Sequence, residues 1–298
     1  MATLRELKTR IGSVSSSEKI TGAMKMISSA KVHKNEAALR RLLPFKNQIR
    51  RIMGHILSSG VSFHSPLIVE REVNTVGVVV YGSDDGLCGA YNMNIFKRLL
   101  VEFNRLRDTY GHDVRFVLYP VGKKVAKAVG HLASQGVEIR RFPGVDSKME
   151  AGRVNDFTGS LRDAFVSGEI DLIEVVYMRF LSMSRQVATV DKLYPVSHDT
   201  LLDSADNAVK GEENQLYIFE PDANSIFNEV LPMFVLSMMQ EITIENRASE
   251  QAARVMAMQA ANDNAKTLLE ELSLEYNKLR QQSITTELLD IIGGQIGR

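Results

Sequence analysis

The chain has 298 residues, of which 44% are apolar, and its 36 basic and 36 acidic side chains give a formal net charge of zero. This length accommodates one large or two small globular domains. No run of 18 apolar residues occurs, which excludes a membrane-spanning helix. The single cysteine, Cys88, excludes an internal disulfide and fits a reducing compartment.

The zero net charge conceals a strong asymmetry along the chain. Residues 1–60 contain 12 Lys or Arg against 3 Asp or Glu, whereas residues 222–298 contain 6 against 11. Opposite charges suit two helices lying side by side, with a positive surplus left for an acidic partner. Nucleic acid is the usual partner of a basic helix, but this segment lacks the interleaved aromatic residues that stack on bases. We therefore expect no nucleic-acid binding.

A long helix is predicted from the first residues to about Leu57. Thr3 and Glu6 have the spacing of a capping box, which marks a helix start. Pro44 should bend or break this helix just before it. Apolar residues recur at intervals of three and four, at Leu4, Leu7, Ile11, Val14, Ile20, Met24 and Ile27.

In the middle of the chain the pattern changes to strands that alternate with helices. We expect strands at residues 73–81, 114–119, 137–142, 171–181 and 186–193. We expect helices at residues 92–104, 123–134 and 156–166. This order indicates an open, Rossmann-like α/β sheet with parallel parts. The polar segment 197–213 is expected to be a loop.

The last quarter, from Ile226 to Ile292, is predicted to form one very long helix. No proline follows Pro232, and the next glycines, Gly293 and Gly294, are the expected stop signal. A helix of about 60 residues is roughly 90 Å long. Its larger apolar residues form a narrow seam, at Val255, Met258, Leu268, Leu269, Leu272, Tyr276, Leu279, Ile284, Leu288 and Ile291. This favours a coiled coil over a buried helix of a bundle.

Two long helices at opposite ends of the chain, each with half a seam, most simply pair with each other. The predicted fold is therefore α/β plus a long antiparallel coiled coil, with an open α/β sheet domain inserted between the paired N- and C-terminal helices. The predicted segments are residues 1–58 for the first helix, 70–220 for the α/β domain and 222–294 for the last helix.

The turn at residues 82–92, GSDDGLCGAYN, follows a predicted strand and precedes a helix, as phosphate-binding loops do. Its glycines match neither a dinucleotide-binding fingerprint nor a P-loop, and Asp84 and Asp85 would repel a phosphate. We interpret it as a structural turn. The six histidines are scattered, and Cys88 has no activating histidine in a recognisable motif. We predict a small buried thiol there, and neither a metal site, a cofactor nor a catalytic group.

Five stretches of the chain together resemble the gamma subunit of F-type ATP synthases, in order and over nearly the whole length. They are ITGAMKM at 20–26, DGLCGAYN at 85–92, YIFEPD at 217–222, ASEQAAR at 248–254 and YNKLRQQSIT at 276–285. The resemblance implies a central rotor shaft that is not itself catalytic. Its coiled coil would enter a ring of three alpha and three beta subunits. The α/β domain would bind the epsilon subunit and rest on the c-subunit ring, and proton flow would turn the shaft.

The resemblance also assigns contact residues. Ile20, Met24 and Lys25 would meet the acidic lever region of beta. Arg254, Arg280, Gln281 and Thr285 would hydrogen-bond to beta loops near the catalytic sites. Tyr217, Phe219 and Glu220 would lie at the foot, facing the c ring and epsilon.

Two positions depart from the family pattern: Gly22 stands where many relatives carry lysine, and Asp85 where they often carry arginine. The helix pattern begins directly at Thr3, so we expect no targeting peptide, a bacterial source and a peripheral location on the cytoplasmic face of the inner membrane. Two alternatives from other classes are a coiled-coil scaffold or tether, and an α/β nucleotide-binding enzyme with a helical oligomerisation arm.

Overall fold

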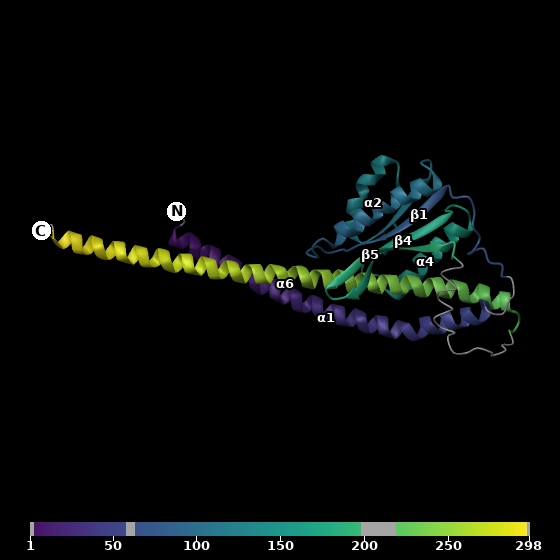
Figure 1. Cartoon of the computed structure of the whole chain (residues 1–298), viewed down its shortest axis with the longest axis horizontal. Coiled ribbons are helices and arrows are strands. Elements are labelled where there is room, and N and C mark those ends of the chain that lie inside the picture. Colours follow the sequence, from purple (N-terminus) through teal and green to yellow (C-terminus); the bar gives the residue numbers. More distant parts are fainter. Residues whose placement is uncertain (1–2, 58–62, 198–218, 297–298) are drawn as a thin grey trace. The chain divides into compact units, whose positions relative to one another are not determined.

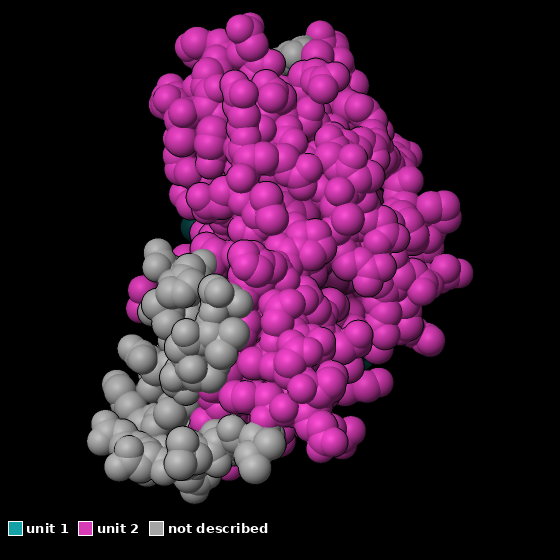
Figure 2. All heavy atoms as spheres, turned by 90° about the vertical axis from the view of Figure 1, so that its right-hand side faces the viewer, with its two compact units in different colours: residues 1–29, 254–298 teal, residues 30–253 magenta. Residues whose placement is uncertain are grey.

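The computed structural model describes residues 3–57, 63–197 and 219–296. The chain divides into two compact units, which are considered separately. Unit 1 comprises Met1–Ser29 and Arg254–Arg298, and unit 2 comprises Ala30–Ala253. In the space-filling view of Figure 2, unit 2 forms one continuous body. Helices α1 (Leu4–Leu57) and α6 (Ala223–Ile296) each contribute one end to each unit.

A five-stranded sheet organises unit 2, with the strand order β3-β2-β1-β4-β5. The strands are β1 (Thr75–Tyr81), β2 (Arg115–Val121), β3 (Glu138–Ile139), β4 (Leu172–Ser182) and β5 (Arg185–Tyr194). The first four are mutually parallel, and β5 pairs antiparallel with β4 at one edge. Helices on both faces bury the parallel strands, which explains why β1 is a continuous apolar run rather than an alternating one.

The two faces of the sheet belong to two separate hydrophobic clusters. On one face, Val78 and Val80 pack with α2 (Tyr91–Tyr110) and α3 (Lys123–Val129). On the other, Val79 and Tyr81 pack with α4 (Ala151–Val166). Figure 1 shows α2 and α4 on opposite sides of the sheet.

The part of α1 and α6 that belongs to unit 2 completes the second cluster. Met53 of α1 and Leu231 of α6 are both fully buried in it. The Lys46 ammonium forms an ion pair with the Glu241 carboxylate between the two helices. The hydroxyls of Tyr81 and Thr243 are 2.8 Å apart, which ties α6 to the central strand. In unit 2 the two helices are thus a layer of the α/β domain.

The predicted fold class is confirmed, as is the capping box: the Thr3 amide donates to Glu6 Oε2 at 2.8 Å and the Glu6 amide to Thr3 Oγ1 at 3.2 Å. Of the bend or break predicted at Pro44, the break does not occur, because α1 continues to Leu57. Pro44 lies on the exposed face of the helix. Water can therefore hydrate the carbonyl that loses its amide partner.

Other boundaries differ from the expectations. Helix α6 passes through Gly293 and Gly294 to Ile296, so the predicted glycine stop is wrong. The helix expected at 123–134 is α3 followed by a 3-10 turn, η1 (Gly130–Gln135). Helix α4 begins at Ala151, five residues before the predicted start at residue 156, and β3 is only two residues long. The loop expected at 197–213 lies almost entirely outside the described residues.

Candidate functional site

The turn between β1 and α2 passes very close to the start of α3. The Gly82 amide donates to the Val121 carbonyl at 2.8 Å. A Cβ on Gly82 would lie 2.5 Å from Val125 Cβ, and a Cβ on Gly122 would lie 2.9 Å from the Gly82 carbonyl oxygen. Gly122 also has a φ of +112°. Only glycine permits this approach of the two backbones.

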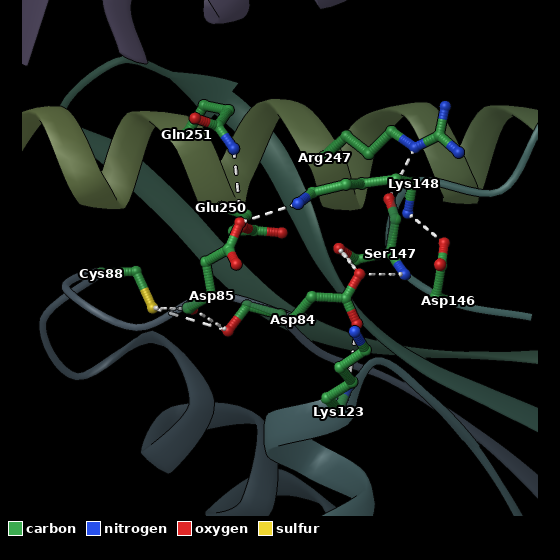
Figure 3. Close-up of polar contacts among 11 residues, drawn as sticks. Asp84, Asp85, Cys88, Lys123, Asp146, Ser147, Lys148, Arg247, Glu250 and Gln251 are labelled. Atoms are coloured by element: carbon green, nitrogen blue, oxygen red, sulfur yellow. Dashed lines mark hydrogen bonds and ion pairs between the residues drawn. The ribbon is translucent and has the colours of Figure 1, made fainter. Parts of the chain in front are cut away.

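Asp84 occupies the carboxyl edge of the sheet, where parallel α/β domains bind ligands. Its Oδ1 accepts a hydrogen bond from the Lys123 amide, at the start of α3, at 2.9 Å. Its Oδ2 accepts from the Ser147 amide at 3.2 Å and from the Ser147 hydroxyl at 2.8 Å. Figure 3 shows these three donors converging on the one carboxylate. The amide at the start of α3 and both Ser147 donors are therefore satisfied by a carboxylate of the protein itself.

Asp85, the next residue, points to the other side of the turn. Its Oδ2 lies 2.9 Å from the Lys148 ammonium, and both side chains are exposed. The hydrogen bond to Asp85 raises the pKa of Lys148. The Asp85 carboxylate therefore ties the turn to the segment before α4.

Arg247 of α6 connects to the same segment. Its Nε donates to the Ser147 carbonyl at 2.7 Å, and its Nη2 donates to the Met149 carbonyl. Burial lowers the pKa of this guanidinium. We call Asp84, Asp85, Ser147, Lys148 and Arg247 the turn cluster. It fastens three segments that are far apart in the sequence, and its contacts are those of a structural latch.

Catalytic chemistry near the turn cluster would use a nucleophile or a bound metal ion. Cys88 is buried, with its sulfur 3.8 Å from the Ser83 hydroxyl and 3.5 Å from Asn92 Nδ2, so the predicted buried thiol is confirmed. Within the described part of the chain, no group of three or more His, Cys, Asp or Glu side chains is placed to hold a metal ion.

Unit 1 contains a pair of helices formed by the start of α1 and the last part of α6. The Lys25 ammonium donates to Gln259 Oε1 at 2.7 Å. Further along, Asn262 Nδ2 donates to the Glu18 carbonyl at 2.7 Å. From Lys25 to Glu18 the residue number falls along α1, while from Gln259 to Asn262 it rises along α6. The two helices are therefore antiparallel. Leu7, Val255, Met258 and Leu272 are buried and belong to the predicted seams.

Comparison with known proteins identifies this combination of an α/β domain and antiparallel helices. The family described as ATP synthase matches residues 3–296. The ATP synthase gamma chain of Bacteroides thetaiotaomicron is 38% identical over 301 residues, which cover 99% of this chain and 100% of that one. The chain belongs to the ATP synthase gamma-chain family. The resemblance inferred from the five sequence stretches is confirmed.

Other members of the family and solved structures agree. The ATP synthase gamma chain of Pasteurella multocida is 36% identical, covering 99% of each chain. A chain in a cryo-EM structure of the Euglena gracilis mitochondrial ATP synthase has the same fold, with a TM-score of 0.62 and 19% identity over 99% of this chain and 94% of that one. A chain of the Tetrahymena thermophila central stalk and c ring matches with a TM-score of 0.53 and 19% identity, covering 81% and 99%.

Residues that the gamma-chain resemblance assigns to beta contacts on the first helix differ in exposure. Ile20 is 60% exposed, whereas Met24 and Lys25 are half-buried. The Lys25 ammonium already donates a hydrogen bond to Gln259 on α6. Of these three residues, Ile20 is therefore the most accessible to another subunit.

On α6 the assigned residues fall into two environments. Arg254 is 5% exposed, so its guanidinium is largely withdrawn from solvent. Arg280, Gln281 and Thr285 are all exposed. The Thr285 hydroxyl donates to the Gln281 backbone carbonyl at 2.9 Å, within the helix.

The residues assigned to the foot of a gamma chain lie elsewhere. Phe219 is half-buried against the hydrophobic cluster of α4, α1 and α6 in unit 2, and Glu220 is exposed. Tyr217 lies outside the described residues. All seven shaft residues belong to unit 1, whereas Phe219 and Glu220 belong to unit 2.

Sequence reasoning missed two buried asparagines of α6. Asn246 Oδ1 accepts from the Tyr91 hydroxyl at 2.6 Å, and its Nδ2 donates to the Gly82 carbonyl at 3.4 Å. Asn262, at the Glu18 carbonyl, is 6% exposed. The signal was available, because asparagine is a weak helix former and these two interrupt a segment rich in Ala, Met and Gln.

Proposed function

We propose that this chain is the central rotor shaft of a proton-translocating F-type ATP synthase. In this role it couples proton flow through the membrane sector to ATP synthesis on a ring of alpha and beta subunits, and it is not itself catalytic. Its partners are the three alpha and three beta subunits, the epsilon subunit and the c ring. Membership of the gamma-chain family supports this role, and so do features of the chain's own surface.

The observation that carries the proposal is the uncovered apolar surface at the end of α6. Leu274, Ile284, Leu288 and Leu289 are 72%, 48%, 54% and 62% exposed. From residue 254 to residue 296 the helix is about 65 Å long. An apolar stripe of this kind is the mark of an interaction surface. Arg280, Gln281 and Thr285 stand on the same stretch, so polar and apolar contacts would face one partner together.

The charge of the first helix suits an acidic partner. Residues 1–60 carry 12 basic side chains against 3 acidic ones. Ile20, Met24 and Lys25 lie within this basic segment, which supports the assignment of an acidic lever region of beta opposite them.

The mechanical role follows from the asymmetry of a helix pair. Three equivalent catalytic sites in a ring can be held in different states only by something that lacks threefold symmetry. A pair of helices presents a different face to each site, so each orientation stabilises a different site conformation by differential contact free energy. The hydrogen bonds that Asp84 accepts within the chain support a structural role for this turn, and so a shaft that does not itself bind nucleotide.

As a gamma chain the protein is part of the membrane-associated F1 sector. No helix in the described ranges is long and apolar enough to cross a bilayer. We place the shaft at the cytoplasmic face of a bacterial inner membrane, as a peripheral subunit, on the strength of its bacterial relatives.

Substitution of the exposed α6 residues tests the proposal. Arg280→Ala and Gln281→Ala should each lower proton-coupled ATP synthesis by about tenfold in a reconstituted complex, because each removes a hydrogen bond to a charged or buried group of beta. The melting temperature of the free chain should not change. Lys278→Ala, an exposed charge on the same helix, is the matched control. Normal synthesis in both variants, or an equal loss in the control, would contradict the assignment.

A second measurement separates the rotor from the enzyme and the scaffold. The isolated chain should bind no ATP or ADP tightly and hydrolyse none, which an α/β nucleotide-binding enzyme would do. It should also restore ATPase activity to an alpha and beta ring, which a static scaffold would not.

A further inference from the structure

A cavity of about 380 Å³ lies in unit 2 between α1, α4 and α6. Its walls are mainly apolar, with Ala37 and Ala38 from α1, Met149 and Val154 at the start of α4, and Ile244 from α6. A volume in this range matches that of small-molecule sites, which are mostly apolar with a few polar groups. The turn cluster borders the cavity, because Arg247 of this cluster lines the cavity and donates a hydrogen bond to the carbonyl of Met149, another lining residue.

The charged groups that line the cavity all have the same sign. They are Lys34, Arg41 and Arg247, and no Asp or Glu lines the cavity among the described residues. Of the neutral polar side chains that line the cavity, Asn35, Gln240 and Thr243, the last two have described partners: the Thr243 hydroxyl donates to the Met239 carbonyl at 2.7 Å, and Gln240 Nε2 donates to Asn155 Oδ1 at 3.1 Å. The three cations are therefore the charged groups that a ligand in the cavity would meet directly, while Asp146, Glu250 and Asp84, which do not line the cavity, also act on Arg247.

None of these cations is neutralised by a described ion pair. Lys34 and Arg41 are exposed, and neither has a described hydrogen bond or ion pair. Arg247 uses its described hydrogen bonds on backbone carbonyls rather than on a carboxylate. Burial lowers its pKa, so a neighbouring anion would offset the desolvation of its charge.

We propose that this cavity binds a small amphiphilic anion, that is, one carboxylate or sulfonate on an apolar ring or chain. The apolar body would fill the space between Ala38, Val154 and Ile244, and the acid group would face Lys34, Arg41 and Arg247. Such a ligand would bridge α1, α4 and α6 within unit 2. The inference rests on the cavity alone and does not depend on the proposed function.

The test uses the full-length chain with methyl-labelled methionine and 2-naphthoate as the probe. The Met149 methyl resonance, identified by its loss in Met149→Leu, should shift saturably, with a dissociation constant of about 1 mM or tighter for a ligand of this size. Met178, buried on the opposite face of the sheet, should not shift. The neutral isostere 2-naphthamide should bind about tenfold more weakly.

Matched charge variants make the result specific. The double variant Lys34→Gln, Arg41→Gln removes two charges that line the cavity and should weaken 2-naphthoate binding about tenfold. The control Lys31→Gln, Arg40→Gln removes two charges from the same helix that do not line it, and should leave binding within about twofold. An unchanged Met178 resonance reports that each variant is folded. Absence of a saturable Met149 shift, equal binding of the amide, or equal weakening in the control would each overturn the proposal.

Discussion

The side-chain amide of Asn262 donates to the Glu18 carbonyl at 2.7 Å, and its nitrogen lies 3.4 Å from the position that a Cβ on Gly22 would take. Glu18 and Gly22 are one helical turn apart, so the asparagine rests on the backbone of α1 where the missing side chain leaves room. A buried asparagine at a helix pair fixes the register of the two helices, usually at some loss of stability. Gly22 thus lies directly opposite Asn262 in the helix pair.

Replacement of Gly22 by alanine should stabilise the helix pair. The added Cβ would stand at ordinary van der Waals distance from Asn262, and alanine is favoured over glycine in a helix by about 1 kcal/mol. Gly12→Ala is the matched control, because nothing lies within 4 Å of its Cβ position. Both variants should unfold at a higher temperature by circular dichroism. A loss of stability in Gly22→Ala alone would show that Asn262 cannot tolerate the methyl group.

Asn262→Leu should separate stability from register. The Glu18 carbonyl keeps its bond within α1, so the substitution leaves no buried acceptor without a partner, and the leucine adds apolar burial. We expect unchanged or higher thermal stability but a less well-defined register. Spin labels at exposed positions 13 and 266, in a chain with Cys88→Ala, would then give a broader distance distribution than in the parent. An equally narrow distribution would contradict a register role for Asn262.

The buried carboxylates of unit 2 predict a pH dependence of stability. Burial raises the pKa of Glu174 to about 7, with Glu102 of α2 adding to the rise and Arg105 opposing it. Because the folded pKa lies above the ordinary value of 4.5, the native state holds an extra proton between these values. This contribution to stability is complete below about pH 4.5 and is lost as pH rises to about 7.

Glu174→Gln should remove the part of the pH dependence that comes from this residue and leave the part that comes from Glu245. Between pH 5 and pH 8 the free energy of unfolding of the parent should fall by on the order of 1–3 kcal/mol through this group. The curve for the variant should be flatter. Glu169→Gln, an exposed carboxylate in the same unit, is the control and should follow the parent. A variant whose stability changes with pH as much as the parent's would exclude Glu174 as the source.

The ion pair between Lys46 and Glu241 predicts non-additive substitutions. Both side chains are mostly buried, and Glu245, whose pKa is raised to about 7 mainly by burial, is close enough to Glu241 to feel its charge. Lys46→Met would leave the Glu241 carboxylate without its ion-pair partner and should cost about 3 kcal/mol. The double variant Lys46→Met, Glu241→Leu should recover most of that loss in chemical denaturation. Additive losses would show that the two residues are not coupled.

Local sequence signals predicted the main elements well. The capping box at Thr3 and Glu6 gave the start of α1, and the run from Val76 to Val80 gave the buried central strand. The exposed stretch with Arg280 and Gln281 was assigned by the family resemblance alone, and its role remains a proposal. These signals succeed because each depends on residues close together in the chain.

The contacts that shape the sites could not be found in this way. Asp84 meets Ser147, 63 residues later in the chain, and Arg247 lies 100 residues from Ser147. Pro44 shows a different limit: the local rule predicts a bend or a break, and the helix is not broken at this exposed position. Tertiary packing decides the two long-range contacts and solvent exposure decides the outcome at Pro44, and a sequence pattern within one element contains neither.

Direct observation of rotation tests the central claim. A probe attached through Lys127→Cys, an exposed position on α3, would be followed while the chain is assembled with an immobilised alpha and beta ring and supplied with ATP. The single native cysteine is buried and should not compete for the label. The account predicts continuous rotation of the probe in one direction, slowed by Arg280→Ala. A probe that stays fixed relative to the ring while ATP is hydrolysed would contradict it.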